Sequence, residues 1–455
     1  MPRSAKICVS SLGCSKNLVD TEVMLGSLAK SGLEITGDES DADIYVINTC
    51  SFIGPARDES NDTIAKALKW KKKRRNRKVV VAGCLAQREP EETQKAHTGI
   101  DLMLGLDEIA SIGTMVQNML RKLDSVHTFV KEDLPVYLYD ESTPRLLVTP
   151  SHYAYVKISE GCNHKCSFCA IPTFRGKLRS RAVQSLVKEC QALLNRGVRE
   201  LILVSQNATD YGSDFGDGTS LSQLLRALDE LQAPGGEYWI RVLYLYPTSV
   251  TDELIQTFAE AKHVLKYIDM PLQHASARML TAMRRGITPD RTAKLLAKFR
   301  DRIPGVTMRT TLLVGHPGEQ EDDFAALQDF IRHERFDRVG VFTYSHEKST
   351  HAFTMENDVP AEVAKQRESR LMLAQQEISR EKNQALVGQT LRVIVDEVRE
   401  DDSGLRSCVG RSGGDAPDVD NSIHFPWTEA LGDKIFASVK ILSADAHDLQ
   451  GVIVD

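Results

Sequence analysis

Residues 161–169, GCNHKCSFC, place three cysteines at the spacing C-x3-C-x2-C directly behind a β-rich run. Zinc sites built from thiolates close with four ligands, often in paired C-x2-C units, and no second pair follows here. Three cysteines on one loop instead suit three corners of a 4Fe-4S cube, whose irons take thiolate ligands. The stretch therefore predicts an iron–sulfur loop with one open iron, placed at the end of a strand.

The residues around this loop alternate between strand-like and helix-like patterns. Expected strands are residues 154–159, 200–206, 239–246, 267–272, 307–315 and 338–345. Amphipathic stretches such as AVQSLVKECQALLNRG and SLSQLLRALDEL lie between them. Six β/α units without a second sheet predict a partial, open version of the parallel β/α barrel, with its chemistry at the carboxyl ends of the strands.

A second α/β pattern fills the first 120 residues. The runs KICVSSLGC, DIYVINTC and KVVVAGC are each followed by a helical segment, near residues 18–30, 57–73 and 90–97. This alternation predicts a parallel, doubly wound sheet. Cys14, Cys50 and Cys84 each end one of the runs, and strand ends meet at one edge of such a sheet. We therefore expect these three cysteines to converge, whereas Cys8, inside the first run, is expected to be a small core residue.

Changes in pattern divide the chain into four parts. Residues 1–120 form the amino-terminal α/β domain, residues 121–150 a connector with scattered turn signals, and residues 151–385 the barrel core, which ends in a long helix. Residues 386–455 hold short alternating strands split by Gly and Asp, which predict a small all-β barrel.

Composition excludes several classes of protein. The chain of 455 residues is 42% hydrophobic, carries a net charge of −6 and has no apolar run long enough to cross a bilayer. Its first residues lack the apolar core of a signal peptide, so we expect a cytoplasmic protein whose nine cysteines serve metal or redox chemistry rather than disulfides.

Charge is unevenly distributed along the chain. Residues 386–455 hold 13 Asp and Glu against 6 Lys and Arg, which favours a basic protein as the partner of this module. Residues 69–78, KWKKKRRNRK, are in contrast strongly basic, with eight Lys or Arg in ten. Two interpretations of that run remain open: a solvated helix end, or a contact with ribosomal or other RNA.

The cysteine loop resembles that of the radical S-adenosylmethionine enzymes. SQNATDYG, PLQHAS and LLVGHPGE fall at later strand ends, where that family binds its cofactor. The resemblance implies that Cys162, Cys166 and Cys169 hold a 4Fe-4S cluster whose open iron binds S-adenosylmethionine. It also implies cofactor contacts at Gln206, Gln273, Gly315 and Pro317. The reduced cluster would then cleave S-adenosylmethionine to a 5′-deoxyadenosyl radical.

The amino-terminal motifs SLGCSKNLVDTE, INTCSFIGPARDES and VAGCLAQR resemble those of the methylthiotransferases. In that family Cys14, Cys50 and Cys84 would hold a second, auxiliary 4Fe-4S cluster, and the last module would be a TRAM-type barrel. One S-adenosylmethionine would supply a methyl group and another the radical. Sulfur methylated at the auxiliary cluster would then be inserted at the carbon from which the radical removes hydrogen.

Two branches of this family differ in substrate. SLGCSKNLVDTE is similar to SLGCPKNLVDSE of the branch that modifies the β-carbon of an aspartate on the twelfth small-subunit ribosomal protein, while the transfer-RNA branch is closer to TFGCQMN. The resemblance implies the ribosomal-protein branch, a flavodoxin or ferredoxin as electron donor, and a monomer. Asn207 and His316 depart from the usual Asp and Phe of that branch. The alternatives are a transfer-RNA adenosine methylthiotransferase and a non-catalytic module that docks on the ribosome.

Several other polar residues near the loop leave their role open. Arg175, Arg179 and Arg181 are candidates either to steady an anionic group of cofactor or substrate or to form surface salt bridges. His164 either lines the site or faces solvent. Cys190 and Cys408 are expected to be structural, because they lie in a helical pattern and in the small barrel.

Overall fold

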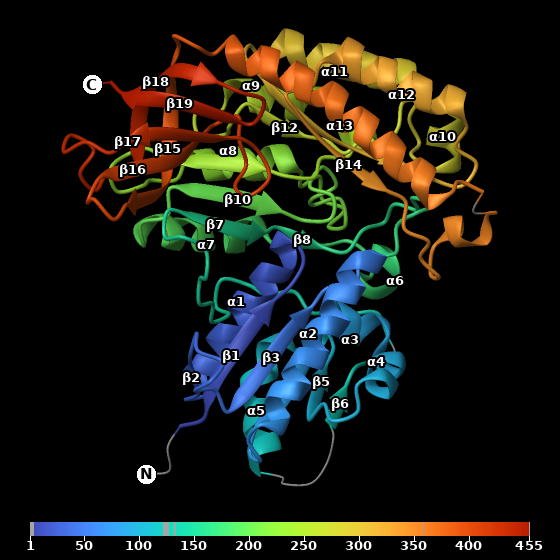
Figure 1. Cartoon of the computed structure of the whole chain (residues 1–455), viewed down its shortest axis with the longest axis vertical. Coiled ribbons are helices and arrows are strands. Elements are labelled where there is room, and N and C mark those ends of the chain that lie inside the picture. The colour runs from blue at the N-terminus through green and yellow to red at the C-terminus, as the bar shows by residue number, and fades with distance from the viewer. Residues whose placement is uncertain (1–3, 122–126, 132, 357, 455) are drawn as a thin grey trace.

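The computed structural model describes residues 4–121, 127–131, 133–356 and 358–454. Figure 1 shows an amino-terminal α/β domain, a central open barrel surrounded by helices, and a small carboxyl-terminal barrel. Within the described residues no helix is both long and apolar enough to cross a membrane. The three-part α/β architecture expected from the sequence is therefore confirmed.

The amino-terminal domain is built on one parallel sheet with the strand order β2-β1-β3-β4-β5-β6. Its strands are β1 (Lys6–Ser11), β2 (Glu34–Ile35), β3 (Ile44–Thr49), β4 (Lys78–Gly83), β5 (Leu102–Leu104) and β6 (His127–Phe129). Its helices are α1 (Ser15–Lys30), α2 (Gly54–Lys72), α3 (Cys84–Arg88), α4 (Pro90–Ala96), the 3-10 helix η1 (Leu106–Ser111) and α5 (Ile112–Arg121).

Alternation along the strands explains why this sheet is covered on both faces. In β3, Ile44 and Val46 pack with α1 and α5, whereas Tyr45 and Ile47 pack with α2. Successive side chains of a strand point to opposite faces, so β3, which is buried at every position, needs a helix layer on each side. The doubly wound prediction is thereby confirmed, and Cys8 lies in the core on the α2 face, as expected.

The segment expected to be a connector contributes a strand of its own. β6 pairs in parallel with β5 and extends the amino-terminal sheet past residue 120. Residues 127–129 of the expected connector thus belong to the amino-terminal sheet, while residues 122–126 and 132 lie outside the described residues. Three residues are too few to produce a readable period, so pairing with β5 rather than sequence pattern defines this strand.

The central domain has six main strands that follow one another in sequence around an open barrel. They are β7 (Tyr153–Lys157), β10 (Glu200–Val204), β11 (Trp239–Val242), β12 (Tyr267–Asp269), β13 (Thr307–Val314) and β14 (Arg338–Thr343). A parallel bridge from Ile240 to Val264 joins the two halves of the sheet. Among the described residues β7 and β14 do not pair, so the barrel is open between them, as predicted.

Helices cover the outside of this barrel. They are α6 (Ile171–Arg175), α7 (Val183–Asn195), α8 (Leu221–Asp229), α9 (Asp252–Glu260), α10 (Ala277–Ala282), α11 (Pro289–Arg302), α12 (Glu321–Glu334) and α13 (Ala361–Gln384). The short strands β8 (Ser159–Glu160) and β9 (Arg179–Ser180) pair beside the cysteine loop. Short 3-10 turns, η2 (Pro247–Ser249) and η3 (His351–Thr354), lie in the loops after β11 and β14. Cys190 is fully buried in the core between α7 and the strands, as expected.

The last module is a closed five-stranded barrel with the order β15-β16-β17-β19-β18. Its strands are β15 (Thr390–Glu400), β16 (Arg406–Ser412), β17 (Ser422–Pro426), β18 (Phe436–Ala444) and β19 (Asp448–Ile453). Cys408 lies in its core, which confirms the structural role expected for that residue.

A buried ionic cluster joins this barrel to the starts of the central strands. Glu200, at the start of β10, accepts hydrogen bonds at 2.7 Å from both Arg241 and Arg411. Burial would raise the pKa of Glu200, but the two guanidinium groups outweigh it and lower the pKa to about 2. Asp415 and Asp420 likewise pair with Arg338 and Arg309 of the central strands. Part of the acidic charge of the last module therefore serves docking within the chain.

Candidate functional site

The cysteine loop begins where β8 ends, at the carboxyl-terminal mouth of the open barrel. Gly161 has a φ of +80°, and a Cβ there would lie 2.1 Å from the carbonyl oxygen of Lys177, so only glycine fits. The amide of Cys162 donates to the carbonyl of Gly176 at 3.1 Å. The amide of Cys169 donates to the carbonyl of Cys166 at 3.2 Å, which turns the loop back on itself.

The three thiols of this loop are close neighbours. The pKa of Cys162 is raised to about 11 and that of Cys169 to about 12, mainly by burial and in smaller part by the neighbouring Cys166 thiol. Thiols with such pKa values stay protonated near neutral pH, and a bound cation would be needed to convert them to thiolates. Metal binding at this loop must therefore release protons.

Two side chains that the sequence did not single out lie against Cys166. The Arg285 guanidinium lies 3.3 Å from the Cys166 sulfur, and the Tyr246 hydroxyl lies 3.7 Å from it. The His164 ring stacks on Tyr246 with centroids 3.7 Å apart, and its Nε2 atom lies 2.9 Å from an Asp210 carboxylate oxygen. His164 is therefore fixed against the site rather than turned freely into solvent.

The three amino-terminal cysteines converge at one edge of the sheet, as predicted. Cys14 caps α1, Cys50 follows β3 directly, and Cys84 begins α3. A Cβ on Gly13, next to Cys14, would lie 2.6 Å from the Cys50 sulfur. The pKa of Cys84 is raised to about 12, mainly by burial; Arg175 opposes this rise, and Cys50 and Cys14 add to it. Cys14 is exposed, and the nearby Lys16 and Arg175 cations lower the pKa of its thiol.

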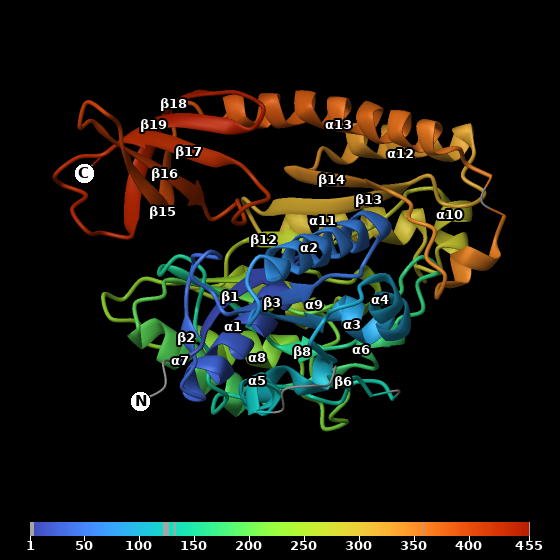
Figure 2. The same ribbon diagram turned by 60° about the horizontal axis from the view of Figure 1, so that its bottom comes forward.

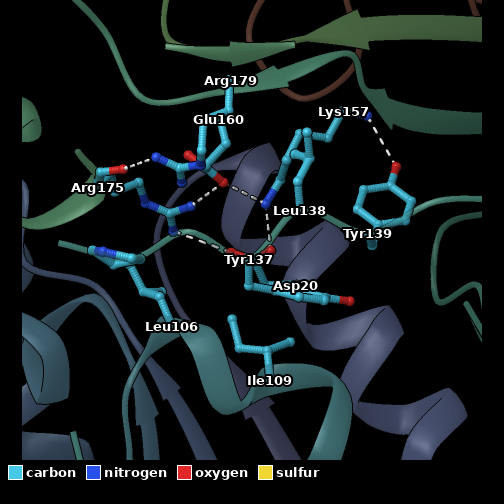
Figure 3. A pocket seen from close by; sticks show the side chains of 11 residues that line it. Asp20, Leu106, Ile109, Tyr137, Leu138, Tyr139, Lys157, Glu160, Arg175 and Arg179 are labelled. Carbon is cyan, nitrogen blue, oxygen red and sulfur yellow. Dashed lines mark hydrogen bonds and ion pairs between the residues drawn. The ribbon is translucent and has the colours of Figure 1, made fainter. Parts of the chain in front are cut away.

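Arg175 connects the two cysteine sets. It ends α6, six residues after Cys169, and its Nη2 lies 3.0 Å from the Cys84 sulfur and 3.1 Å from Asp20 of α1. Its Nη1 donates to Glu160 at 2.7 Å. Figure 3 shows Arg175 between Glu160 and Asp20. One buried guanidinium therefore contacts the auxiliary set and the strand that leads into the cysteine loop.

The charges around Arg175 form one buried network. Lys157 forms ion pairs with both Asp20 and Glu160, which are themselves buried. Burial would raise the pKa of Glu160, but Arg175 and Lys157 hold it well below its usual range. The cavity beside this network measures about 10 Å³, room for about one water and no substrate. The network is therefore a junction between domains and not a binding pocket.

The surface interpretation of the neighbouring arginines is wrong for two of the three. Arg175 and Arg181 are almost fully buried, and Arg181 pairs with Glu189 of α7. Arg179 is partly exposed, and its Nη1 donates to the carbonyls of Arg175 and Lys177. Sequence pattern missed the burial because the acidic partners of Arg175 come from two different domains.

The amino-terminal domain also holds the opposite edge of the open barrel. Glu347, in the loop after β14, is 1% exposed and pairs with Arg57 of α2 and Arg88 of α3. The amide of Gly54, at the start of α2, donates to the Ser345 hydroxyl at 3.0 Å. Because α1 contacts β7 and α2 contacts the loop after β14, this domain spans the opening of the barrel (Figures 1 and 2).

Two glutamines expected at the cofactor lie at the barrel mouth in different settings. The Gln206 amide follows β10 and donates to Glu160, so it belongs to the buried network. Gln273 follows β12 in a left-handed conformation with a φ of +75°, and its backbone bridges to Leu312 of β13. Two backbone hydrogen bonds to β13 hold the strained backbone of Gln273. Its amide donates to the carbonyl of Thr311, and its carbonyl accepts from the amide of Leu313.

The loop after β13 contacts the cysteine loop through His316. The Nε2 atom of His316 lies 2.9 Å from the Ser167 hydroxyl, and its Nδ1 atom lies 3.0 Å from the Pro317 carbonyl. The packing of α13 requires a glycine at position 315. Its φ is +78°, and a Cβ there would lie 2.5 Å from Ala364 of α13, so helix packing excludes larger residues.

Neither cysteine set has the geometry of a site for a single ion. Among the residues that the structure describes, no three His, Cys, Asp or Glu side chains surround one ion position. A cube spreads its thiolates over separate irons, so its ligands lie farther apart than those of a single zinc ion. Converging soft thiol donors without a fourth cysteine fit a cube with an open iron at each set.

The basic run divides into two kinds of side chain. Lys71 and Lys78 pair with Asp101, and Arg77 stacks on Trp70 at 4.2 Å. Three other cations, Lys69, Lys72 and Arg75, line a groove of about 480 Å³ and have no ion pair within the described part of the chain. Its remaining lining residues are Ala65, Leu68, Lys71, Ala96, His97, Thr98 and Gly99. The interpretation as a solvated helix end therefore does not cover the three cations of the groove, which are available to a partner.

Comparison with known families matches all three modules. Residues 6–105 match the uncharacterized protein family UPF0004, residues 156–331 the radical SAM superfamily, and residues 387–454 the TRAM domain. The radical S-adenosylmethionine fold expected from the cysteine spacing is thus confirmed.

Solved structures agree on the fold. A radical S-adenosylmethionine methyltransferase, TsrM from Kitasatospora setae with cobalamin and a [4Fe-4S] cluster bound, superposes with a TM-score of 0.54 at 14% identity over 77% of this chain and 74% of that chain. At such low identity the likeness concerns the fold alone.

Full-length relatives are much closer in sequence. The chain is 44% identical to the ribosomal protein uS12 methylthiotransferase RimO of Desulforamulus reducens, over 97% of this chain and 98% of the relative. It is 43% identical to that of Pelotomaculum thermopropionicum and 40% identical to that of Clostridioides difficile, each over about 99% of both chains. The chain therefore belongs to the RimO family of ribosomal protein uS12 methylthiotransferases.

Proposed function

We propose that this protein transfers a methylthio group to the β-carbon of an aspartate in ribosomal protein uS12. The observation that carries the proposal is the contact of Arg175 with Cys84, which brings the auxiliary cysteine set beside the radical loop. Insertion of sulfur at an unactivated carbon needs a radical source and a sulfur carrier close to the same atom. Two converging cysteine sets at the mouth of one barrel meet that requirement.

The six cysteines are proposed as the ligands of two 4Fe-4S clusters. Cys162, Cys166 and Cys169 would hold the radical cluster, and the remaining three, Cys14, Cys50 and Cys84, the auxiliary cluster. When bound, the clusters and S-adenosylmethionine supply the electron, the radical, the methyl group and the sulfur. Gln206, Gln273, Gly315 and Pro317 are proposed to line the cofactor site, because all four follow strands at the barrel mouth.

The chain's own residues position these groups and protect them from water. Arg285 donates toward the Cys166 sulfur, and Arg175 toward that of Cys84. Hydrogen bonds to ligand sulfurs stabilise added negative charge, so both arginines favour the reduced form of a cluster held there. The amino-terminal domain covers the open side of the barrel, which limits the access of solvent to the reacting groups.

The alternative substrate is an adenosine in transfer RNA. Mass spectrometry of uS12 and of bulk transfer RNA from a deletion strain separates the two activities. We expect uS12 to lose its methylthio group and to regain it on complementation, while transfer-RNA methylthiolation is unchanged. Loss from transfer RNA with unchanged uS12 would reverse the assignment.

The partners follow from this substrate. The enzyme is proposed to act in the cytoplasm as a monomer, with a flavodoxin or ferredoxin as electron donor. We also propose that the groove lined by Lys69, Lys72 and Arg75 binds ribosomal RNA when uS12 is presented on the small subunit. The helix α2 spans about 28 Å between its Gly54 end at the barrel mouth and this groove, so RNA bound there would lie beside the substrate rather than in the site.

Reversing the groove charges tests the RNA contact. The variant K69E/K72E/R75E should bind small subunits more weakly. The slope of its log binding constant against log salt concentration should be smaller by about 2–3, because each lost phosphate contact releases nearly one counterion fewer. Filter binding across a salt series measures both quantities. The control is K30E/K294E/K440E, which changes the same charge at scattered exposed lysines. Equal weakening of the two variants would mean that only net charge matters.

A further inference from the structure

We propose that Lys16 binds the carboxylate of the substrate aspartate and so selects this side chain for modification. Lys16 lies two residues after Cys14, in the first turn of α1, and is 8% exposed. Within the described residues its ammonium makes no hydrogen bond or ion pair, and it lies over the face of the Tyr244 ring, 3.7 Å from the centroid. The assignment rests on the proposed function.

Lys16 lies where the amino-terminal domain meets the mouth of the central barrel. Its backbone belongs to the amino-terminal domain, whereas Tyr244 follows β11 at the mouth of the central barrel. Tyr244 has a φ of +65°, and two hydrogen bonds hold this strained conformation. Its amide donates to the Asp269 carboxylate, and its carbonyl accepts from the amide of Ala208. The ring under Lys16 is thus fixed in place by the barrel, on the side where the substrate must react.

A charge count at the junction supports an anionic ligand. The buried cations are Lys16, Lys157 and Arg175, and the buried carboxylates are Asp20 and Glu160. Both carboxylates are already occupied: each pairs with Lys157 and Arg175, and Glu160 also accepts from Gln206. Among the described residues Lys16 is therefore left without a carboxylate partner, and the anion-forming group beside it is the Cys14 thiol. Its ammonium can still donate hydrogen bonds to an incoming carboxylate.

The carboxylate of an aspartate fits this requirement and also places the reacting carbon. Lysine donates strong, charge-assisted hydrogen bonds to carboxylates. The β-carbon of aspartate is bonded directly to the carboxyl carbon. A carboxylate held by Lys16 therefore also fixes the position of the β-carbon, on the side of Cys14. A neutral side chain, or an adenine ring, would leave the ammonium unpaired and would be rejected.

Discrimination between aspartate and asparagine tests this role directly. The probes are uS12 and the same protein with asparagine in place of the modified aspartate, and binding to the reconstituted enzyme is measured by fluorescence anisotropy. The wild-type enzyme should bind the aspartate form about 10–100-fold more tightly, the effect expected of a charged hydrogen bond. In Lys16→Met, an apolar side chain of similar length, this preference should disappear. Lys30→Met, at the exposed end of the same helix, should keep it.

Iron content separates the competing roles of Lys16. The iron content of Lys16→Met should match that of Lys30→Met, because Lys16 is assigned to the substrate and is not proposed as a cluster ligand. Loss of about half the iron would assign Lys16 to assembly of the auxiliary cluster and overturn the proposal. Retention of the aspartate preference would also overturn it. A wild-type enzyme that neither binds nor modifies uS12 would instead refute the proposed function, and the assignment of Lys16 with it.

Discussion

Replacement of Cys166 by alanine should abolish the formation of 5′-deoxyadenosine from S-adenosylmethionine under reducing conditions. The loop has three cysteines and no fourth, so the loss of one leaves too few thiolates to hold a cube. The iron content should fall from about eight to about four per chain, because the amino-terminal set is untouched. Liquid chromatography of the products and iron analysis measure the two effects.

The control for this substitution is Cys190→Ala. Cys190 is fully buried in the core of the same domain, but it belongs to neither cysteine set. It should retain both the iron and the cleavage activity, at a modest cost in stability. Persistent cleavage in Cys166→Ala, or an equal loss in Cys190→Ala, would remove Cys166 from the radical site.

Replacement of Arg175 by methionine should have the largest effect on stability of any single change at the domain junction. It would leave Asp20 and Glu160 short of one cation in a buried network, and breaking such pairs costs about 3–5 kcal/mol. Methylthio transfer should fall by about 10–100-fold, since Arg175 also supports Cys84. Urea unfolding and the reduction potential of the auxiliary cluster measure the two consequences.

Arg226→Met is the matched control. Arg226 pairs with Glu253 at 2.7 Å, but both side chains are about half exposed, so the pair should contribute less than about 1 kcal/mol. If the two variants were equally stable and the reduction potential did not move in Arg175→Met, Arg175 would have no special role between the cysteine sets.

Much of the fold follows from local pattern. Strands β3 and β4 are mostly apolar and are each followed directly by a cysteine, so both their burial and the meeting of Cys50 and Cys84 could be predicted. In contrast, β6 has three residues and owes its existence to pairing with β5. A period cannot be recognised in so short a segment, so the sequence of the connector shows only scattered turn signals there.

The contacts at the junction between the domains could not be predicted from the sequence. Arg175 is six residues from Cys169 in the chain, yet its partners Asp20 and Cys84 are about 155 and 91 residues away. Burial of a charge depends on long-range contacts that no local pattern records. Lys16 lies inside a recognised motif, but its lack of an acidic partner becomes visible only when α1 is placed against the barrel.

The most direct test of the account is the iron content of the anaerobically reconstituted chain, combined with electron paramagnetic resonance of its reduced form. Two clusters at one junction predict about eight irons per chain and two paramagnetic centres that interact magnetically. The interaction should be absent when Cys14, Cys50 and Cys84 are all replaced by alanine. Zinc with little iron, or two centres with no magnetic interaction in the intact protein, would contradict the account.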